Sequence, residues 1–531
     1  MSQMNTKKPI SIARLLPVVM VALAMLFAAT AHATTPGITG TSFSINAEAN
    51  FISQPDGVMV YSWGYGCLTP PAASSFVPAP LSPTVAGAAC PTMQIPGPTL
   101  IVREGTTVSV TLTNNLPTAA GNTSILFPGF TVTPSNGVPG LLTQEAIHGG
   151  TVTYTFLANK PGTHAYYSGT QGDLQVEMGL YGAIVVIPTA VPANVAGTTC
   201  RAVATNLPDG QTDYRLAASA YDHAGTCYDR EYLFQFSEID PNIHSQAEAI
   251  AKCVAATGIT CPGNMNTVVT ENYHPAYFLI NGRSMPDDMD TNYAAQYPHQ
   301  PYNGNPHMHP GENVLVRVIG QGRWQHPFHE HGNHVRILGR DGNLILSSST
   351  TNPTALAGPL LYTTTTTPGL AMDGIFYWTG KGLNWDVYGH GFPGDTSVCI
   401  PDANGYYTSV PTAPNYYEWC QDHNKALETA PFGTVAGGGP ATLPDPNILT
   451  NGPWYGGSPY LGPDATVRAT GPTGTTPPSG TIANPPTSEA GFAFMWHSHN
   501  EREITTNNIF PGGMMMMMLV DPQAFVINES N

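Results

Sequence analysis

Residues 95–117, IPGPTLIVREGTTVSVTLTNNLP, carry two short strand patterns that are separated by Gly105. The second pattern, from Thr107 to Leu112, alternates β-branched or apolar residues with small polar ones. This period of two predicts a strand with one buried face. Similar signals recur along the chain at 99–102, 151–157, 180–187, 275–281, 312–319, 334–338, 374–378 and 514–520. The chain is therefore predicted to be an all-β protein with Greek-key β-sandwiches.

The composition favours turns and short strands over long helices. Among 531 residues there are 55 Gly and 50 Pro, and 41% of the residues are apolar, which is enough for sizeable cores. One short helix is expected, around Ser245 to Ala255. The 35 acidic and 18 basic residues give a net charge of −17, and the sequence has no Lys/Arg-rich block. Nucleic acid is therefore not an expected partner, because phosphate backbones are bound by clustered positive charge.

The first 33 residues have the pattern of a secretory signal peptide. Basic residues precede an apolar run from Leu15 to Ala29, and Ala31-His32-Ala33 fits an A-x-A cleavage site. The apolar run is shorter than the ~20 residues that a membrane-spanning helix needs. No later stretch is long and apolar enough to span a membrane. We therefore expect a secreted or periplasmic protein with no transmembrane segment after cleavage.

The cysteine count points to disulfides. Eight cysteines are an even number in a chain that is expected to be exported. They lie in four close pairs along the sequence, so the simplest connectivity joins nearest neighbours: Cys67–Cys90, Cys200–Cys227, Cys253–Cys261 and Cys399–Cys420. Because no C-x-x-C motif is present, neither a zinc ribbon nor a thioredoxin-type redox site is expected.

The strand signals fall into two main regions. We predict a first sandwich domain over 40–190, a linker over 191–215 and a second domain over 216–531. The second domain carries insertions at about 240–265 and at 385–490, and the latter is a surface excursion rich in Gly, Pro and Thr. Part of 190–290 could instead form a reduced middle domain. Five consecutive methionines, Met514 to Met518, lie next to Leu519 and Val520 and predict a buried closing strand.

Five histidines lie in two short clusters, HPFHEH at 326–331 and HSH at 497–499. In an extended strand, residues i and i+2 point to one face, so each H-x-H pair can bind one ion. Two such pairs on facing strands would place four imidazoles in one pocket, and imidazole suits Cu, Zn, Fe and Ni. We therefore predict a metal site at these strands. A third pair, His307 and His309, is flanked by prolines and is expected to lie exposed in a loop.

Several blocks of the sequence resemble the multicopper oxidase family, which includes the laccases. The matching segments are Pro96-Gly97-Pro98, Val102 to Gly105, Leu112 to Pro117, Phe278 to Arg283, HPFHEHG at 326–332, HSH at 497–499 and GGM at 512–514. The resemblance covers roughly residues 90–190, 270–345 and 490–522. It implies tandem cupredoxin-like β-sandwich domains, here with long loop insertions. It also implies a copper-dependent oxidoreductase with a blue type 1 copper and a three-copper cluster that is held by eight histidines.

The chain departs from this family's ligand pattern at both copper sites. SILFPG at 124–129 stands where the family has S-I-H-W-H-G, and AYYSG at 165–169 stands where it has W-Y-H-S-H. The N-terminal half of the three-copper cluster therefore lacks all four of its histidines. His326 matches the first type 1 histidine, but Ser498 replaces the type 1 cysteine and Glu503 replaces a further histidine. Because a blue site needs a Cys thiolate, no blue copper is expected.

The remaining candidate metal ligands are His326, His329, His331, His497, His499 and Glu503. They could hold one copper ion or a pair, and the carboxylate would also admit Zn or Mn. Glu330 is expected to point away from His329 and His331, as a supporting or solvated residue. The resemblance also makes a homo-oligomer possible, because two-domain members of the family are often trimers. A trimer would not restore the missing N-terminal histidines, since every copy of the chain lacks them.

Two functions remain open from the sequence alone. The first is an exported oxidoreductase with a non-standard mononuclear or dinuclear copper centre, acting on a small-molecule or metal-ion donor. The second is a non-catalytic protein that binds or sequesters copper, or that only keeps the cupredoxin fold. The resemblance does not decide between them, because the missing type 1 copper removes the family's usual entry point for electrons.

Overall fold

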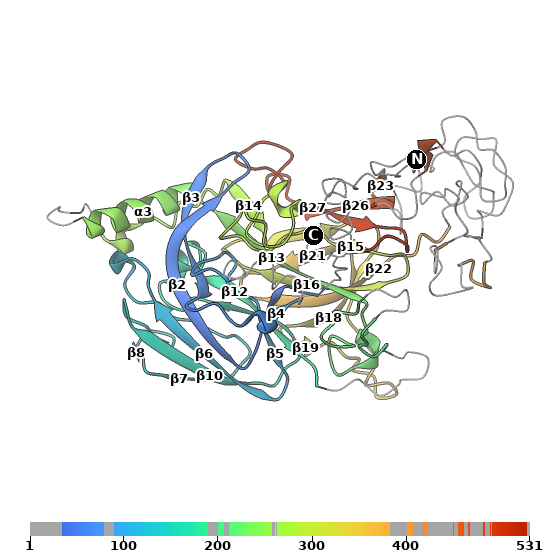
Figure 1. The fold of residues 1–531 in the computed structure, drawn as a ribbon, viewed down its shortest axis with the longest axis horizontal. Helices are drawn as coiled ribbons and strands as arrows, with labels where there is room; N and C mark the ends of the chain where they lie inside the picture. The colour runs from blue at the N-terminus through green and yellow to red at the C-terminus, as the bar shows by residue number, and fades with distance from the viewer. Residues whose placement is uncertain are drawn as a thin grey trace, which may run out of the picture.

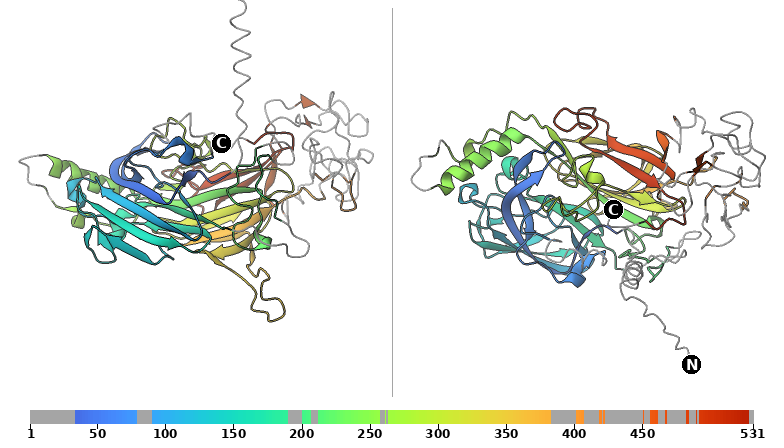
Figure 2. Two further views of the ribbon diagram at one scale, coloured as in Figure 1. Left: turned by 60° about the horizontal axis from the view of Figure 1, so that its bottom comes forward. Right: turned by 45° about the horizontal axis from the view of Figure 1, so that its top comes forward.

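The computed structural model describes most of both predicted domains. The described residues are 34–78, 90–189, 200–206, 212–256, 261, 263–382, 491–527 and short stretches between 401 and 489. The predicted signal peptide, most of the predicted insertion at 385–490, and Cys399 and Cys420 lie outside them. Four large β-sheets form two sandwiches that lie next to each other (Figures 1 and 2). The all-β prediction is confirmed.

The first sandwich consists of two five-stranded sheets, with strand orders β11-β12-β5-β1-β4 and β3-β2-β6-β10-β7. Its strands are β1 (Gly37–Thr39), β2 (Ser42–Ser53), β3 (Met59–Cys67), β4 (Phe76–Val77), β5 (Leu100–Arg103), β6 (Thr106–Asn114), β7 (Val132–Ser135), β10 (Thr151–Ala158), β11 (Gly162–Tyr167) and β12 (Tyr181–Ile187). The alternation that predicted a half-buried strand is present in β6, where Val108, Val110 and Leu112 are fully buried. A small hairpin, β8 (Val138–Pro139) and β9 (Gln144–Glu145), stands apart.

The second sandwich pairs a seven-stranded sheet with a six-stranded sheet. The first contains β13 (Arg230–Ile239), β14 (Tyr277–Ile280), β16 (Asn313–Gly320), β18 (Val335–Arg340), β19 (Asn343–Leu344), β20 (Leu360–Leu361) and β22 (Ala371–Tyr377). The second contains β15 (His307–Met308), β17 (His326–Glu330), β21 (Thr363–Thr366), β23 (Gly457–Tyr460), β26 (Gly491–Ser498) and β27 (Met515–Val520). Strands β13 and β14, from the region that could have formed a middle domain, join this sandwich. A further pair is β24 (Thr466–Val467) with β25 (Ile482–Ala483).

The methionine run forms the buried closing strand that the sequence predicts. Strand β27 pairs antiparallel with β26, and Met514, Met516 and Met518 are fully buried in the core between the sheets. Trp496 and Phe494 of β26 lie in the same core. The unbranched thioethers fill the space between these rings, which is the usual role of Met in an irregular core.

Helix α3 (Pro241–Ala255) arises from the second half of the chain but packs on the first sandwich. Asp240 caps it by accepting a hydrogen bond from the Asn242 N–H, and Pro241 begins it. Its buried residues join the apolar core of the first sandwich, and Figure 1 shows α3 beside β3. The remaining short helices are α2 (Gly172–Gln175), η3 (Ala73–Ser75), η5 (Thr118–Ala120), η6 (Ala224–Thr226), η7 (Met265–Thr267) and η8 (Asp287–Met289).

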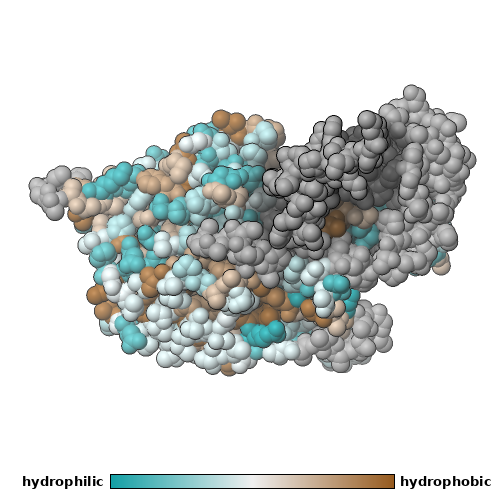
Figure 3. All heavy atoms as spheres, viewed as in Figure 1, coloured by the Kyte–Doolittle hydropathy of each residue, from teal (hydrophilic) through white to brown (hydrophobic). Residues whose placement is uncertain are grey.

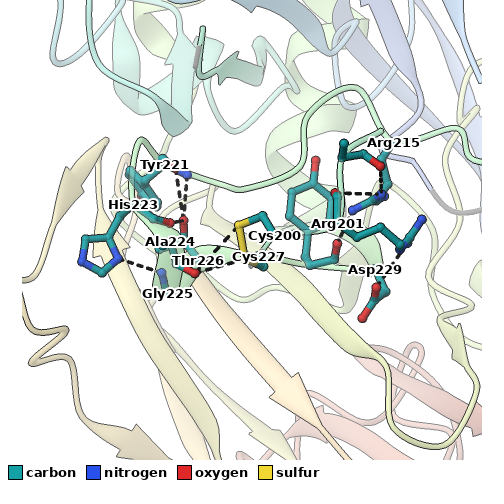
Figure 4. Close-up of a disulfide and its surroundings, with 12 residues drawn as sticks. Cys200, Arg201, Arg215, Tyr221, His223, Ala224, Gly225, Thr226, Cys227 and Asp229 are labelled. Carbon is teal, nitrogen blue, oxygen red and sulfur yellow. Dashed lines mark hydrogen bonds and ion pairs between the residues drawn. A yellow bond between two sulfur atoms is a disulfide. The ribbon is translucent and has the colours of Figure 1, made fainter. Parts of the chain in front are cut away.

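Three of the four predicted disulfides are present: Cys67–Cys90, Cys200–Cys227 and Cys253–Cys261. Figure 4 shows how Cys200–Cys227 ties the segment after the first domain to the η6 loop. Figure 3 shows hydrophilic and hydrophobic residues intermixed on the described part of one face. None of the helices in the described part of the chain has the length and apolarity that a bilayer crossing requires.

The two sandwiches meet at a buried network of charges around Arg317. The Arg317 guanidinium lies 2.7 Å from a Glu231 oxygen and 3.3 Å from an Asp373 oxygen, and all three side chains are almost fully buried. Asp373 also accepts hydrogen bonds from the Thr163 N–H and hydroxyl, on β11 of the first domain. Tyr221 donates a further bond to Asp373. Because buried charges are costly unless they are paired, this network fixes how the domains dock.

We expect Arg317→Met to lower the free energy of unfolding by about 3–5 kcal/mol, because two carboxylates would be left buried without their cation. Chemical denaturation followed by tryptophan fluorescence would measure this loss. The matched control is Lys252→Met, which breaks an exposed i,i+4 pair with Glu248 and should cost about 0.5 kcal/mol or less. Equal losses in the two variants would contradict the role of the network.

Candidate metal centre

The two H-x-H motifs lie on neighbouring strands of one sheet. Strand β17 pairs antiparallel with β26, and His329 stands directly opposite His497. Because side chains alternate across a strand, His329 and His331 share one face of the sheet while Phe328 points into the core. Phe328 is fully buried in the core cluster of the second sandwich. The register of this pair therefore brings the two motifs to the same face.

Four imidazoles converge on this face, as the sequence predicted. The ring centres of His329, His331, His497 and His499 lie 4.9 to 5.5 Å apart in the five closest pairs. One nitrogen from each of His329, His331 and His497 lies within 4.8 Å of the others. These three side chains are buried or nearly so, whereas the His499 side chain is 51% exposed. The cluster is therefore open to solvent on the His499 side.

Hydrogen bonds fix which nitrogen each ring presents. Nδ1 of His497 lies 2.7 Å from the Ser498 carbonyl oxygen, and Nδ1 of His331 lies 3.4 Å from the Gly456 carbonyl oxygen. A carbonyl oxygen only accepts, so both Nδ1 atoms carry the proton and both Nε2 atoms carry a lone pair. Nδ1 of His329 contacts the Thr363 hydroxyl at 2.8 Å. Its Nε2 is buried and has no partner among the described residues.

The Nε2 atoms face one another without protons between them. Nε2 of His331 and Nε2 of His497 are only 3.2 Å apart. Burial, followed by the neighbouring histidines, lowers the pKa of His329 to about 4. Burial is also the largest cause that lowers the pKa of His331 to about 4 and the pKa of His497. All three rings are therefore neutral at neutral pH, which is the protonation state that binds metal.

A metal ion fits this donor set. Two imidazole nitrogens that bind one ion at about 2.0 Å, at a tetrahedral angle, lie about 3.3 Å apart. The 3.2 Å separation of the His331 and His497 Nε2 atoms matches that spacing. An ion between them would also satisfy the orphaned Nε2 of His329. The carbonyl and hydroxyl partners of the Nδ1 atoms are the outer contacts that orient metal-binding histidines.

The structure does not bring His326 and Glu503 to this cluster. His326 projects to the core side of β17, with Nδ1 2.9 Å from Glu503 Oε2 and Nε2 3.0 Å from Glu238 Oε2. Glu503 also accepts a short hydrogen bond from the Ser498 hydroxyl and another from Asn500. The predicted ligand set therefore divides into a four-histidine cluster and a separate acid–histidine network. The three positions that match the family's type 1 ligands do meet, but as a hydrogen-bonded network.

His326 is held as an imidazolium. Burial alone lowers its pKa, but the hydrogen bonds and charges of Glu238 and Glu503 outweigh burial and raise the pKa to about 9. Glu238 continues the network to the first domain, because Tyr273 bridges it to Glu177 at 3.1 and 2.7 Å. Burial and the charge of Glu238 raise the pKa of Glu177 to about 8. A proton therefore stays on each of these two groups at neutral pH.

Two other predictions need correction. His307 and His309 are buried, not exposed: His307 lies in β15 with Nδ1 2.7 Å from Asp521, and His309 contacts Glu312. The flanking prolines suggested a loop, but pairing with β27 encloses this segment. Glu330 does point away from the cluster, but it is fully buried and accepts a hydrogen bond from Thr364. Burial raises the pKa of Glu330, so this carboxyl is not a solvated charge.

Three residues at these sites were not found from the sequence. The Tyr455 ring lies 5.0 Å from His331 and 5.7 Å from His329, and Gly456 supplies the carbonyl for His331. Both belong to the predicted insertion, where no pattern marked them. Glu238 is the penultimate residue of strand β13, which was not predicted. The alternation of Tyr232, Phe234 and Phe236 in that strand is the signal that could have found it.

Comparison with known proteins gives a family match in the first domain and several relatives that match short stretches of the sequence. A match to the multicopper oxidase family covers residues 87–190. This match covers most of the first sandwich domain. The multicopper oxidase MCE of Talaromyces pinophilus is 38% identical over 98 residues, which are 18% of this chain and 15% of that protein. Copper resistance protein A of Pseudomonas syringae pv. tomato is 37% identical over 93 residues, 17% of this chain and 14% of that protein. The resemblance to multicopper oxidases that the sequence predicted is confirmed for this part of the chain.

Solved structures align over more of the chain. A multicopper oxidase named mgLAC is 15% identical, with a TM-score of 0.41, and the alignment covers 90% of this chain and 86% of that one. A blue copper oxidase from Nitrosomonas europaea is 14% identical with a TM-score of 0.40, over 90% of this chain and 85% of that one. In the sequence comparison, by contrast, the matching part of the chain spans only about one seventh of the length of the two relatives named above.

We expect the free energy of unfolding to fall as the pH rises from about 6.5 to about 9. The folded protein keeps a proton on His326 that the unfolded chain releases, so this stabilisation is complete below pH 6.5 and is lost as the pH rises through 9. The shift corresponds to about 3 kcal/mol. Thermal unfolding at a series of pH values would measure the decline, and His326→Gln should be less stable at pH 6 but lack this slope.

Glu177→Gln is the companion variant. The folded state keeps a proton on Glu177 up to about pH 8, whereas the unfolded chain releases it near the usual pKa of a glutamate. The free energy of unfolding therefore falls as the pH rises between these two values. Glutamine keeps the shape and removes this part of the decline, while the part that His326 causes between about pH 6.5 and pH 9 remains. A wild-type profile that is flat from pH 6 to 9 would contradict both assignments.

Proposed function

We propose that this chain is an exported copper-binding oxidoreductase whose copper ion is held by His329, His331 and His497, with His499 as a fourth ligand. The observation that supports this most strongly is the convergence of three buried imidazoles, with the unprotonated Nε2 atoms of His331 and His497 3.2 Å apart. Neutral rings with lone pairs this close repel one another unless a cation lies between them. The match to the multicopper oxidase family at 87–190 is the reason to expect copper as that cation.

The donor set favours copper over harder metals. Three or four imidazoles suit Cu and Zn, whereas Mn prefers carboxylate and water oxygens. Glu503 and Glu330 are both directed to the core side and hydrogen-bonded there, and the exposed Glu501 lies 3.7 Å from Nδ1 of His499 rather than among the three buried rings. We therefore propose one ion per chain, since one nitrogen from each of the three buried rings lies within 4.8 Å of the other two. The exposed His499 leaves one side of the ion accessible to a small molecule.

The residues of the chain prepare this site in three ways. The carbonyl groups of Ser498 and Gly456 fix the rings with Nε2 inward. Burial keeps the rings neutral and ready to bind. The packed core on the other side of the sheet excludes water from that direction. When bound, copper would supply one-electron redox chemistry, which is the basis for proposing an oxidoreductase.

A blue type 1 copper is not part of this proposal. Ser498, His326 and Glu503 occupy the matching positions and bond to one another and to Glu238. The cysteines of the described part of the chain are all in disulfides. Export is supported by these disulfides, which persist in oxidising compartments, and by the sequence pattern of residues 1–33.

Elemental analysis of the purified chain after copper loading and desalting should give about one copper per chain, in line with one three-imidazole site. His497→Ala should lose this copper, because it removes one of the two nitrogens that are closest together. Glu503→Gln should retain it, since Glu503 contacts His326, Ser498 and Asn500 instead. Copper loss in Glu503→Gln, or full retention in His497→Ala, would refute the proposed ligand set.

The copper-loaded protein should show no intense absorption at about 600 nm, because it lacks the thiolate ligand of a blue site. Electron paramagnetic resonance should instead show a copper centre with nitrogen ligands. Oxygen consumption with phenols or Cu(I) as donors then separates the two functions. Copper binding with no oxidase activity would favour a binding or sequestering protein, and an intense blue band would overturn the ligand assignment.

A further inference from the structure

A cavity of about 620 Å³ lies on the outer face of the seven-stranded sheet. Arg336 and Leu338 of β18 and Ile375 and Tyr377 of β22 form its floor, because these alternate positions face away from the core. One wall is the η6 loop at 224–227, which the Cys200–Cys227 disulfide anchors (Figure 4). Cavities of about 300–1,000 Å³ commonly hold small molecules.

The described lining of this cavity carries positive charge and no carboxylate. Arg336 donates to the Gly358 carbonyl oxygen at 2.9 Å, and no described carboxylate forms an ion pair with it. Asp229 lies behind Asn313, but Arg201 and the Asn313 N–H already engage it, and Figure 4 shows Arg201 beside Asp229. An arginine without a carboxylate partner is suited to a small anion. Leu338, Ile375 and Tyr377 beside it provide apolar surface for the rest of such a ligand.

A series of aromatic rings joins this cavity to the histidine cluster. His334 lines the cavity, and its ring centre lies only 3.7 Å from the ring centre of Tyr362. Tyr362 lies 6.1 Å from Tyr455, and Tyr455 lies 5.0 Å from His331. The cavity wall is also close along the chain, because His334 follows His331 by three residues. Two tyrosines, which are oxidisable side chains, therefore lie between the cavity and the proposed copper.

We propose that the cavity binds a small aromatic carboxylate and that a hydroxylated ring of this class passes electrons to the copper through Tyr362 and Tyr455. The electron path rests on the proposed function, whereas ligand binding to the cavity does not. In each step the bound donor loses one electron, its phenolic proton passes to solvent, and copper(II) is reduced to copper(I). The Arg336 guanidinium pairs with the carboxylate, as Arg does in bidentate sites. In the multicopper oxidase family, electrons enter through the type 1 copper, for which this chain lacks the thiolate ligand. The route through Tyr362 and Tyr455 would take its place.

Binding is tested on the metal-free protein by calorimetric titration with benzoate and with 3,4-dihydroxybenzoate. Both should bind, and Arg336→Gln should weaken both by about tenfold or more, because a charged hydrogen bond is lost. Benzyl alcohol, the neutral analogue, should bind more weakly and respond little to Arg336→Gln. Leu360→Trp fills the cavity and should weaken all three ligands. Unchanged benzoate affinity in Arg336→Gln and Leu360→Trp would overturn the site.

The electron path is tested on the copper-loaded protein without oxygen. Saturating 3,4-dihydroxybenzoate should bleach the copper(II) resonance signal, and Tyr362→Phe should slow the bleaching while benzoate affinity and copper content stay unchanged. Tyr297→Phe, which alters a tyrosine outside both the cavity and the path, is the matched control. Equal rates in wild type and Tyr362→Phe would refute the path. A chain that binds no copper would overturn the proposed function and the path together, whereas the titration still decides the cavity.

Discussion

The antiparallel pairing of β17 with β26 is the constraint on which both polar centres of the second domain depend. With His329 opposite His497, alternate side chains on each strand point to opposite faces. The outer face receives the imidazoles that fit a metal ion. The core face receives His326 and Ser498, which belong to the acid–histidine network. A slip of one residue in this register would turn the outer-face imidazoles toward the core and the core-face residues His326 and Ser498 toward solvent.

Buried charges then decide how the rest of the molecule is arranged around this sheet. Arg317 joins both domains through Asp373 and Thr163, and His326 joins them through Glu238, Tyr273 and Glu177. In both places a buried cation is enclosed by buried carboxylates, so the loss of either partner is strongly destabilising. At the positions that match a type 1 copper, an imidazolium supplies the positive charge between the acidic residues. At these positions, hydrogen bonds and ion pairs around His326 therefore connect the surrounding strands in a chain that has no thiolate there.

The local patterns predicted much of the fold and part of the site. The alternation in β6, the methionine strand β27, three disulfides and the convergence of four histidines followed from spacing alone. The partners of His326 and His307 could not be found, because Glu238 and Asp521 come from distant strands and meet them only after the sheets form. Tyr455 belongs to a segment without periodicity. Residues that meet through tertiary packing leave no trace in a pattern of two or three positions.

Helix α3 has a consequence for how the chain can be divided. Residues Ile243, Ala247, Ile250 and Ala251 complete the apolar interior of the N-terminal sandwich, although they follow its last strand by more than fifty positions. A fragment cut near residue 190 would leave this surface in contact with water and prone to self-association. Conversely, the C-terminal half alone would carry helix α3 with its apolar face exposed to solvent. The halves are therefore not interchangeable modules, and recombination or truncation at the linker would separate one hydrophobic nucleus into two incomplete pieces.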